Sequence, residues 1–163
     1  MTGDLVKICF TLNPDDWHGT PGERLWAKPI PDAAAPSAYE LDNSPFFAKG
    51  VSYRDIVRAV EVDGALEFAG VIAHSGRSTY RILIDRETDA FRDWWSRLNA
   101  LGCTYEKGDV NGRKLLSVDV PPEADIHAVH EILVAGKGNK IWLFELGYLG
   151  HPLRDDPASS PGM

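Results

Sequence analysis

The first seventy residues alternate between short apolar runs and clusters of turn residues. Within the runs, apolar and polar positions mostly alternate, which is the pattern of strands with one buried face. The run over residues 56–62 also fits a helix, but the Asp63-Gly64 dipeptide after it is typical of a hairpin turn and favours a strand. A small antiparallel sheet, strongly curved or closed into a barrel, would bury the apolar faces. We predict strands over residues 5–12, 23–30, 38–41, 56–62 and 66–72.

The spacing changes in the second half, where two segments carry apolar residues at intervals of three and four. This spacing places the side chains on one face of a helix. Asp85 or Thr88 can cap the first helix, and Gly102 ends it. Pro121-Pro122 opens the second helix, and residues 136–139 close it. The predicted buried stripes are Phe91, Trp94, Trp95, Leu98 and Leu101, and then Ile126, Val129, Ile132 and Leu133.

Four further strands are predicted around these helices, over residues 79–84, 103–106, 114–120 and 141–146. The order strand, helix, strand, strand, helix, strand is that of the ferredoxin-like fold, in which two helices cover one face of a four-stranded antiparallel sheet. The predicted fold class is therefore α+β: an N-terminal curved antiparallel β-sheet or small barrel, followed by a ferredoxin-like βαββαβ half. We predict a β-rich subdomain over residues 1–76, a ferredoxin-like subdomain over 77–151 that folds with it as one unit, and a disordered tail over 152–163.

Composition and charge narrow the class of protein. The chain has 163 residues, of which 44% are hydrophobic and 25% charged, as in an ordinary globular protein. Its net charge of −7 would repel phosphate backbones, so we expect no nucleic-acid partner. No signal peptide and no apolar run long enough for a membrane span is evident. We therefore predict no membrane association. Because Cys9 and Cys103 are far apart and expected to be buried free thiols, we also predict a cytoplasmic location.

The chain is organised around residues 41–55, which join two predicted strands with turn residues, an aromatic pair and four charges. Phe46-Phe47 is a candidate contact for a partner, because aromatic residues are typical anchors of interfaces. The better interpretation is that this pair plugs the core between the two halves. Lys49, Tyr53 and Asp55 form a candidate polar set, although Tyr and Lys are weak bases unless their pKa is lowered.

A second polar cluster, His74-Ser75-Gly76-Arg77-Ser78, lies at another join between strands. Its backbone donors and its guanidinium could bind an anion. Its serines could equally bond their own backbone in a turn. The site depends on whether this loop meets the segment 42–55 in space. The candidate binding residues are Phe46, Lys49, Tyr53, Asp55, Ser75, Arg77 and Ser78.

We find no catalytic, metal or cofactor signature. His127, His130 and Glu131 share a helix face at separations that could hold a metal. Their order differs from the zinc-protease motifs, and they fall away from the buried stripe, so a solvated face is the better interpretation. A Gly-x-Ser-x-Gly elbow, a dinucleotide fingerprint and a P-loop do not occur. We predict no catalytic residue, no metal site and no cofactor.

Several runs taken together form a specific pattern: Leu25-Trp26-Ala27, the run 41–53 with Asp55, Ser75-Gly76-Arg77-Ser78-Thr79, Leu101-Gly102-Cys103, Val118-Asp119-Val120-Pro121 and Leu149-Gly150-His151. On these runs the chain resembles a family of small bacterial proteins, domain-of-unknown-function family 4265. The resemblance implies no established activity and no catalytic residue. Some small acidic bacterial proteins of this kind are immunity partners that block a toxin, which is an analogy of size and charge.

Two functional hypotheses follow. The first is a non-enzymatic binding protein, such as an immunity or regulatory protein, that binds and neutralises a protein partner, with a toxin as one candidate; its acidic surface would suit a basic partner. The alternative is a small-ligand-binding protein or enzyme whose site lies between the two halves, where such sites prefer to lie. Nucleic-acid recognition by the open face of the sheet would need exposed aromatics such as Tyr80 and Tyr105, and the net charge disfavours it.

Overall fold

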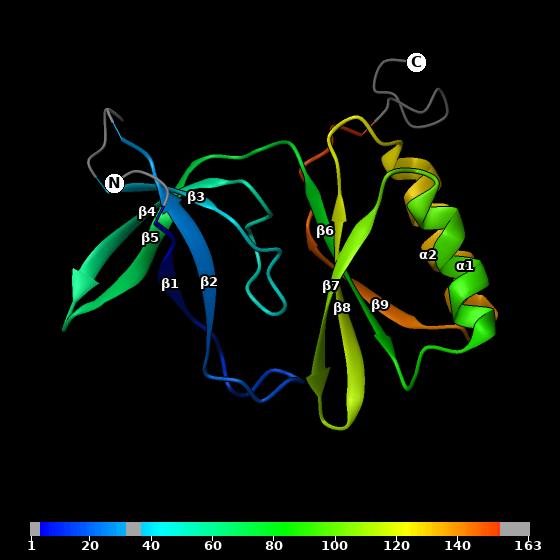
Figure 1. Ribbon diagram of the computed structural model, residues 1–163. Coiled ribbons are helices and arrows are strands. Elements are labelled where there is room, and N and C mark those ends of the chain that lie inside the picture. The colour runs from blue at the N-terminus through cyan, green and yellow to red at the C-terminus, as the bar shows by residue number, and fades with distance from the viewer. Residues whose placement is uncertain (1–3, 32–36, 154–163) are drawn as a thin grey trace, which may run out of the picture.

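The computed structural model describes residues 4–31 and 37–153. These residues form an α+β protein in which a barrel and a helix-covered sheet lie side by side (Figure 1). Strands predominate, and the described residues contain two helices, both in the C-terminal half. Apart from Pro152 and Leu153, the tail predicted to be disordered lies outside the described residues.

The N-terminal half is a closed five-stranded barrel. Neighbouring strands pair antiparallel from β1 to β5, and a short parallel pairing of β1 with β5 closes the barrel. Irregular register in β4, of the kind that β-bulges produce, accompanies this curvature. The predicted curved antiparallel sheet is therefore confirmed. The strands are β1 (Val6–Thr11), β2 (Gly22–Pro29), β3 (Ala38–Leu41), β4 (Ile56–Val62) and β5 (Ala65–Ala73).

The C-terminal half is a four-stranded sheet in the order β7-β8-β6-β9, with every neighbouring pair antiparallel. Both helices lie on the face of this sheet that points away from the barrel (Figure 1). The domain boundary predicted after residue 76 falls between β5 and β6. The elements are β6 (Ser78–Ile84), α1 (Asp89–Asn99), β7 (Thr104–Val110), β8 (Arg113–Val120), α2 (Ile126–Gly138) and β9 (Leu143–Tyr148).

Short sequence motifs correctly predicted the two hairpin turns and the start of α1. Asp63-Gly64 and Asn111-Gly112 both adopt positive φ at each residue, as the predicted tight hairpins require. Thr88 caps α1 by accepting a hydrogen bond from the backbone N–H of Phe91 at 3.0 Å. The start of α2 is a correction: it begins after Asp125, whose carboxylate accepts from two backbone N–H groups, so Pro121-Pro122 lie in the preceding turn.

The two halves have separate hydrophobic cores. One fills the barrel, with Ile8, Leu25 and Val57 among its fully buried residues. The other lies between the sheet and its helices, and it takes alternate residues of the sheet, including Ile82 and Val118. The remaining alternate residues of β6 and β8 face the barrel, because successive side chains of a strand point to opposite faces. A binding site formed by both halves would therefore lie where this second face of the sheet meets the barrel.

Candidate functional site

The face of the sheet that meets the barrel is polar at its centre. It presents Arg81 on β6 together with Ser117 and Asp119 on β8, all of them buried. Residues 42–55, drawn in cyan, lie between the barrel and the sheet (Figure 1). The hydroxyl of Ser117 bonds the Ser44 hydroxyl at 2.8 Å and the carbonyl of Pro45 at 2.6 Å. The segment that organises the sequence is thus the layer that joins the two halves, and we call this region the junction.

Two carboxylates hold the first part of this segment by its backbone. Glu23 on β2 accepts hydrogen bonds from three consecutive N–H groups, those of Phe46, Phe47 and Ala48, at 2.6, 3.0 and 2.9 Å. Glu106 on β7 accepts from the N–H of Ser44 at 2.6 Å. Charge-assisted bonds of this kind are about twice as strong as neutral ones. They fix an irregular loop whose backbone donors would otherwise be buried without partners.

Asp55 connects the loops of residues 42–55 and 74–78, whose proximity could not be predicted from the sequence. Its side chain is fully buried, and it accepts hydrogen bonds from the N–H of Ser52 at 2.9 Å and the N–H of Ser75 at 2.8 Å. The imidazole Nδ1 of His74 lies 2.9 Å from the same carboxylate. The Ser75 hydroxyl donates to the carbonyl of Tyr53 at 2.9 Å. The loops therefore do meet, and both bind to one buried carboxylate.

Phe46 and Phe47 are half-buried within the junction. The Phe46 ring lies against Gly108 of β7, where a Cβ would approach the ring to 3.2 Å, so any larger residue at this position would have to displace the ring slightly. The ring of Phe47 lies 4.6 Å from the His18 ring and 6.2 Å from the Trp17 ring, measured between centroids. This placement agrees with the interpretation in which Phe46 and Phe47 fill the space between the two halves.

Ser78 and Arg77 also use their polar atoms within the protein. The buried Ser78 hydroxyl lies 2.6 Å from Nδ1 of His151, whose Nε2 donates to the carbonyl of Pro121 at 2.8 Å. Arg77 forms an ion pair with Asp119 and lies over the ring of Tyr53 at 5.1 Å. Ser78 therefore anchors the end of β9 to the start of β6.

Lys49 lies apart from Arg77. Its ammonium group is 4.0 Å from Glu145 on β9, whereas Arg77 pairs with Asp119 on β8. Strand β6 separates these two strands in the sheet. Each predicted cation therefore has its own carboxylate, and the two carboxylates line different pockets.

Sequence reasoning missed Arg81, which is the least satisfied charged group of the junction. Its side chain is 1% exposed, and its Nη2 donates to the carbonyl of Ala48. Its Nε and Nη1 are buried and have no hydrogen-bond partner among the described residues. Burial lowers the pKa of Arg81, and the nearby Glu145 and Glu23 partly offset that effect. The available signal was a charged residue at the centre of a predicted strand, directly before the apolar run Ile82-Leu83-Ile84.

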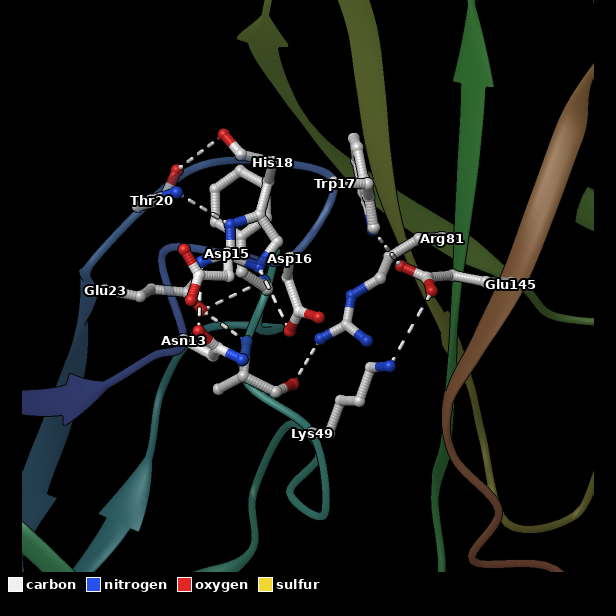
Figure 2. A network of polar contacts seen from close by, with 12 residues as sticks. Asn13, Asp15, Asp16, Trp17, His18, Thr20, Glu23, Lys49, Arg81 and Glu145 are labelled. Carbon is white, nitrogen blue, oxygen red and sulfur yellow. Dashed lines mark hydrogen bonds and ion pairs between the residues drawn. The ribbon is translucent and has the colours of Figure 1, made fainter.

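Figure 2 shows the polar network around this guanidinium. Arg81 reaches from β6 toward the loop that carries Lys49, while Glu145 approaches from β9. The loop between β1 and β2 brings Trp17 to the same place, and its indole N–H donates to Glu145 at 3.2 Å. Arg81 thus lies where three separate parts of the chain come together.

A pocket of about 180 Å³ opens beside this network. Arg81 and Glu145 supply its charges, and the remaining walls are mainly apolar. A concave site with apolar walls and a few converging polar groups is the usual form of a small-molecule site. The other lining residues are Trp17, Leu83, Leu115, Leu143 and Phe144.

A second junction pocket, of about 210 Å³, is acidic, and Asp42, Glu106 and Asp119 are among its lining residues. Asp119 has one buried carboxylate oxygen without a partner among the described residues. Burial raises the pKa of Asp119, and the Arg77 guanidinium works in the opposite direction.

Other candidate groups occupy structural positions. Tyr80 and Tyr105, which the nucleic-acid alternative needed on the open face, pack on the helix side of the sheet. Nδ1 of His130 lies 3.2 Å from the Tyr80 hydroxyl.

Cys103 is a buried free thiol whose pKa is raised by burial to about 12, and Cys9 is free and half-buried. Within residues 4–31 and 37–153, no group of three or more His, Cys, Asp or Glu is arranged to hold a metal ion. No helix in the same residues has the length and apolar character needed to cross a membrane.

The comparisons with known proteins establish a family and a fold. The chain belongs to the family described as "Domain of unknown function (DUF4265)", whose model matches residues 23–144. The structure is similar to one described as a novel crystal structure of a hypothetical protein from Neisseria gonorrhoeae, with a TM-score of 0.74 and 23% sequence identity over 92% of this chain and 99% of the other. That identity supports the shared fold alone. No curated protein matches the sequence.

Proposed function

We propose that this protein binds a small molecule in the 180 Å³ pocket between the barrel and the sheet. The observation that carries the proposal is the buried Arg81 guanidinium in the pocket wall, two of whose nitrogens have no partner among the described residues. Buried polar groups in native proteins are nearly always hydrogen-bonded, and an exception calls for an explanation. A ligand that accepts hydrogen bonds from this guanidinium is such an explanation.

The chemistry around the pocket favours binding over catalysis. The Ser75 hydroxyl donates to a backbone carbonyl, and Ser78 is buried against His151. The Cys103 thiol stays protonated at neutral pH because its pKa is about 12. A nucleophile needs an adjacent base or a lowered pKa. Ser78 has a base beside it in His151, but its hydroxyl is fully buried and also accepts from the N–H of Gly150 at 2.9 Å. A non-enzymatic ligand-binding protein therefore fits the junction better than an enzyme does.

The hypothesis of a protein partner, including a toxin, stays a prediction, as does the cytoplasmic location. The hypothesis rested on the negative charge, the aromatic loop and the lack of a catalytic signature. In the structure the two rings of that loop, Phe46 and Phe47, are half-buried against residues of the junction. Hot-spot anchors must be free to enter a pocket on the partner. The pocket beside Arg81 therefore has the stronger support.

We also infer that the C-terminal half is of the ferredoxin-like class. The element order β6-α1-β7-β8-α2-β9 and the strand order β7-β8-β6-β9 with antiparallel neighbours support this assignment. The barrel covers the face of the sheet that the helices leave free. The pocket is therefore lined by residues of both halves, with Trp17 from the barrel half and the other residues from the sheet.

The experiment is a ligand-observed NMR screen of a chemically diverse set of small molecules. Leu143 lines the pocket and is 49% exposed, so Leu143→Trp should fill the pocket mouth without disturbing a core. Val134 is 50% exposed on α2, and Val134→Trp is the matched control on a different surface. We expect compounds that bind the wild type and Val134→Trp but not Leu143→Trp. A screen in which no compound is sensitive to Leu143→Trp would contradict the proposal.

A further inference from the structure

We propose that the ligand of this pocket is a small monocarboxylate with an apolar body, whose carboxylate is bound by Arg81. The proposal rests on the function proposed above and adds the chemical class of the ligand. It combines the unpartnered donors of the guanidinium, the apolar walls of the pocket, its size, and the charges at its mouth.

The first step concerns hydrogen-bonding capacity. A guanidinium has five N–H donors in a fixed planar arrangement and no acceptor. Arg81 uses Nη2 on the carbonyl of Ala48, which leaves the single N–H of Nε and both N–H groups of Nη1 without a partner. A planar carboxylate takes two parallel N–H bonds from a guanidinium, either from Nε with Nη2 or from Nη1 with Nη2. Ala48 uses only one of the two N–H groups of Nη2, so one such pair stays complete and a carboxylate is the expected acceptor.

The second step concerns the rest of the ligand. Leu83 and Leu115 form part of the pocket floor, and the edge of β9 contributes Leu143 and Phe144. Polar groups placed against these walls would lose their hydration without gaining partners. A cavity of about 150 Å³ with apolar walls is large enough to bind benzene. At about 180 Å³, this pocket therefore has room for a body of similar size.

The third step concerns charge. Glu145 lines the same pocket, and its two carboxylate oxygens face the indole N–H of Trp17 at 3.2 Å and the ammonium group of Lys49 at 4.0 Å. Its negative charge opposes that of an anionic ligand, whereas Arg81 and Lys49 favour it. Glu23 also lies near Arg81, so the charges around the pocket nearly cancel and do not by themselves distinguish a monoanion from a dianion. The apolar walls do, because phosphate has no apolar body to bury and would lose its hydration against them. The site should therefore prefer a monocarboxylate.

The fourth step concerns access. Arg81 is 1% exposed and its Nη1 is packed against β9 at Gly147, so a ligand reaches the guanidinium only after a local movement at the pocket. Trp17 lines the pocket, is 47% exposed and lies on the loop between β1 and β2. Rotation of Trp17 away from Glu145 would break its hydrogen bond to that carboxylate and its edge contacts with the rings of His18 and Phe47. We therefore expect Trp17 to respond to binding, which provides a local spectroscopic signal.

The experiment titrates the folded full-length protein with benzoate and with benzamide, its neutral analogue of nearly the same shape, and follows backbone amide shifts by NMR. We expect saturable binding of benzoate, with benzamide weaker by roughly tenfold to hundredfold because benzamide offers one neutral carbonyl oxygen in place of two charged oxygens. Inorganic phosphate should not displace benzoate. The indole N–H resonance of Trp17, assigned by its loss in Trp17→Phe, should shift during the benzoate titration.

The variant arm uses Arg81→Met, which keeps the length and apolar stem of the side chain and removes the guanidinium. Benzoate binding should fall to the level of benzamide in this variant. Arg97→Met is the matched control, because Arg97 pairs with Asp93 on the exposed side of α1 and should leave binding unchanged. If Arg81→Met does not fold, the comparison of benzoate with benzamide on the wild type decides the question by itself.

The outcomes separate this proposal from the function on which it rests. Equal binding of benzoate and benzamide would overturn the role of Arg81 and leave a small-molecule site. Failure of benzoate to bind, combined with other compounds that are sensitive to Leu143→Trp, would overturn the carboxylate class alone. Absence of any compound sensitive to Leu143→Trp would overturn both. Displacement of benzoate by phosphate would show a general anion site and would also contradict the proposal.

Discussion

Glu23 and Arg81 are charged groups on opposite sides of the same junction, and they differ in how fully they are bonded. The carboxylate of Glu23 accepts from three consecutive backbone N–H groups. The guanidinium of Arg81 donates to one carbonyl and keeps two nitrogens without a partner. The first pattern is that of a group that holds a loop in place. The second is costly for stability alone, which is why we assign Arg81 to binding.

The same contrast separates the candidate residues predicted from the sequence. Asp55, Ser75 and Ser78 form hydrogen bonds that connect the two loops or anchor a strand end. Their bonds resemble those of Glu23. A recognisable run of residues such as 41–55 can therefore serve to connect two hydrophobic cores rather than to bind a ligand. The predictions below test this division, beginning with the largest expected effect.

Asp55→Ala should have the largest effect on stability. It removes a fully buried carboxylate and leaves the N–H groups of Ser52 and Ser75 without their acceptor. We expect the free energy of unfolding to fall by about 3 kcal/mol, as when one partner of a buried charged pair is removed. Urea unfolding followed by circular dichroism measures this change. The control Asp109→Ala, on an exposed carboxylate, should cost about 0.5 kcal/mol or less. A loss below about 1 kcal/mol for Asp55→Ala would mean that water replaces the carboxylate.

Glu23→Ala should cost somewhat less, about 2 kcal/mol, because its carboxylate is only partly buried. The change should concentrate in the junction: the amide protons of Phe46, Phe47 and Ala48 should exchange faster than in the wild type, while those of the sheet core do not. Hydrogen exchange measured by NMR tests both parts. Glu61→Ala, at an exposed position of β4, is the control and should leave these three amides unchanged. Uniform acceleration across the protein would contradict a local role.

Arg81→Met should change the free energy of unfolding by only about 1 kcal/mol or less, in either direction. The substitution leaves the carbonyl of Ala48 without the Arg81 donor, but it also removes a buried charge that forms no ion pair within residues 4–31 and 37–153. Replacing buried charged groups with apolar residues of similar volume is often neutral or stabilising. The measurement is the same urea unfolding. A loss above about 3 kcal/mol would place Arg81 with Glu23 and Asp55 as a structural group.

The smallest effect concerns pH and Asp119. Because burial raises its pKa, the folded state holds the Asp119 proton more tightly than the unfolded state. Its contribution to stability is therefore fully present below the unfolded pKa and is lost as pH rises through the folded pKa. The melting temperature of the wild type relative to Asp119→Asn should decrease as pH rises toward neutral. A relative melting temperature that increases with pH would mean that the ion pair with Arg77 outweighs the cost of burial.

Local patterns predicted most of the elements because they depend on neighbours in the chain. The two hairpins follow from Asp63-Gly64 and Asn111-Gly112, whose positive φ angles suit those residue types. The helix of residues 89–99 follows from its apolar spacing and from the cap of Thr88. The start of α2 was misplaced because Pro121-Pro122 is an equally good helix-start signal until the cap of Asp125 is seen.

The sequence by itself determined the α+β class, the family, the turns and the importance of residues 41–55, since each of these depends on short-range pattern or on a recognisable run. The tertiary structure alone decided that the 42–55 and 74–78 segments meet at Asp55 and that Lys49 and Arg77 pair with carboxylates of two different pockets. It also decided that two buried nitrogens of Arg81 have no partner among the described residues. Hydrogen-bond satisfaction depends on which distant strand or loop is packed opposite a residue. That packing follows from two separate cores meeting, and no local pattern in the chain specifies it.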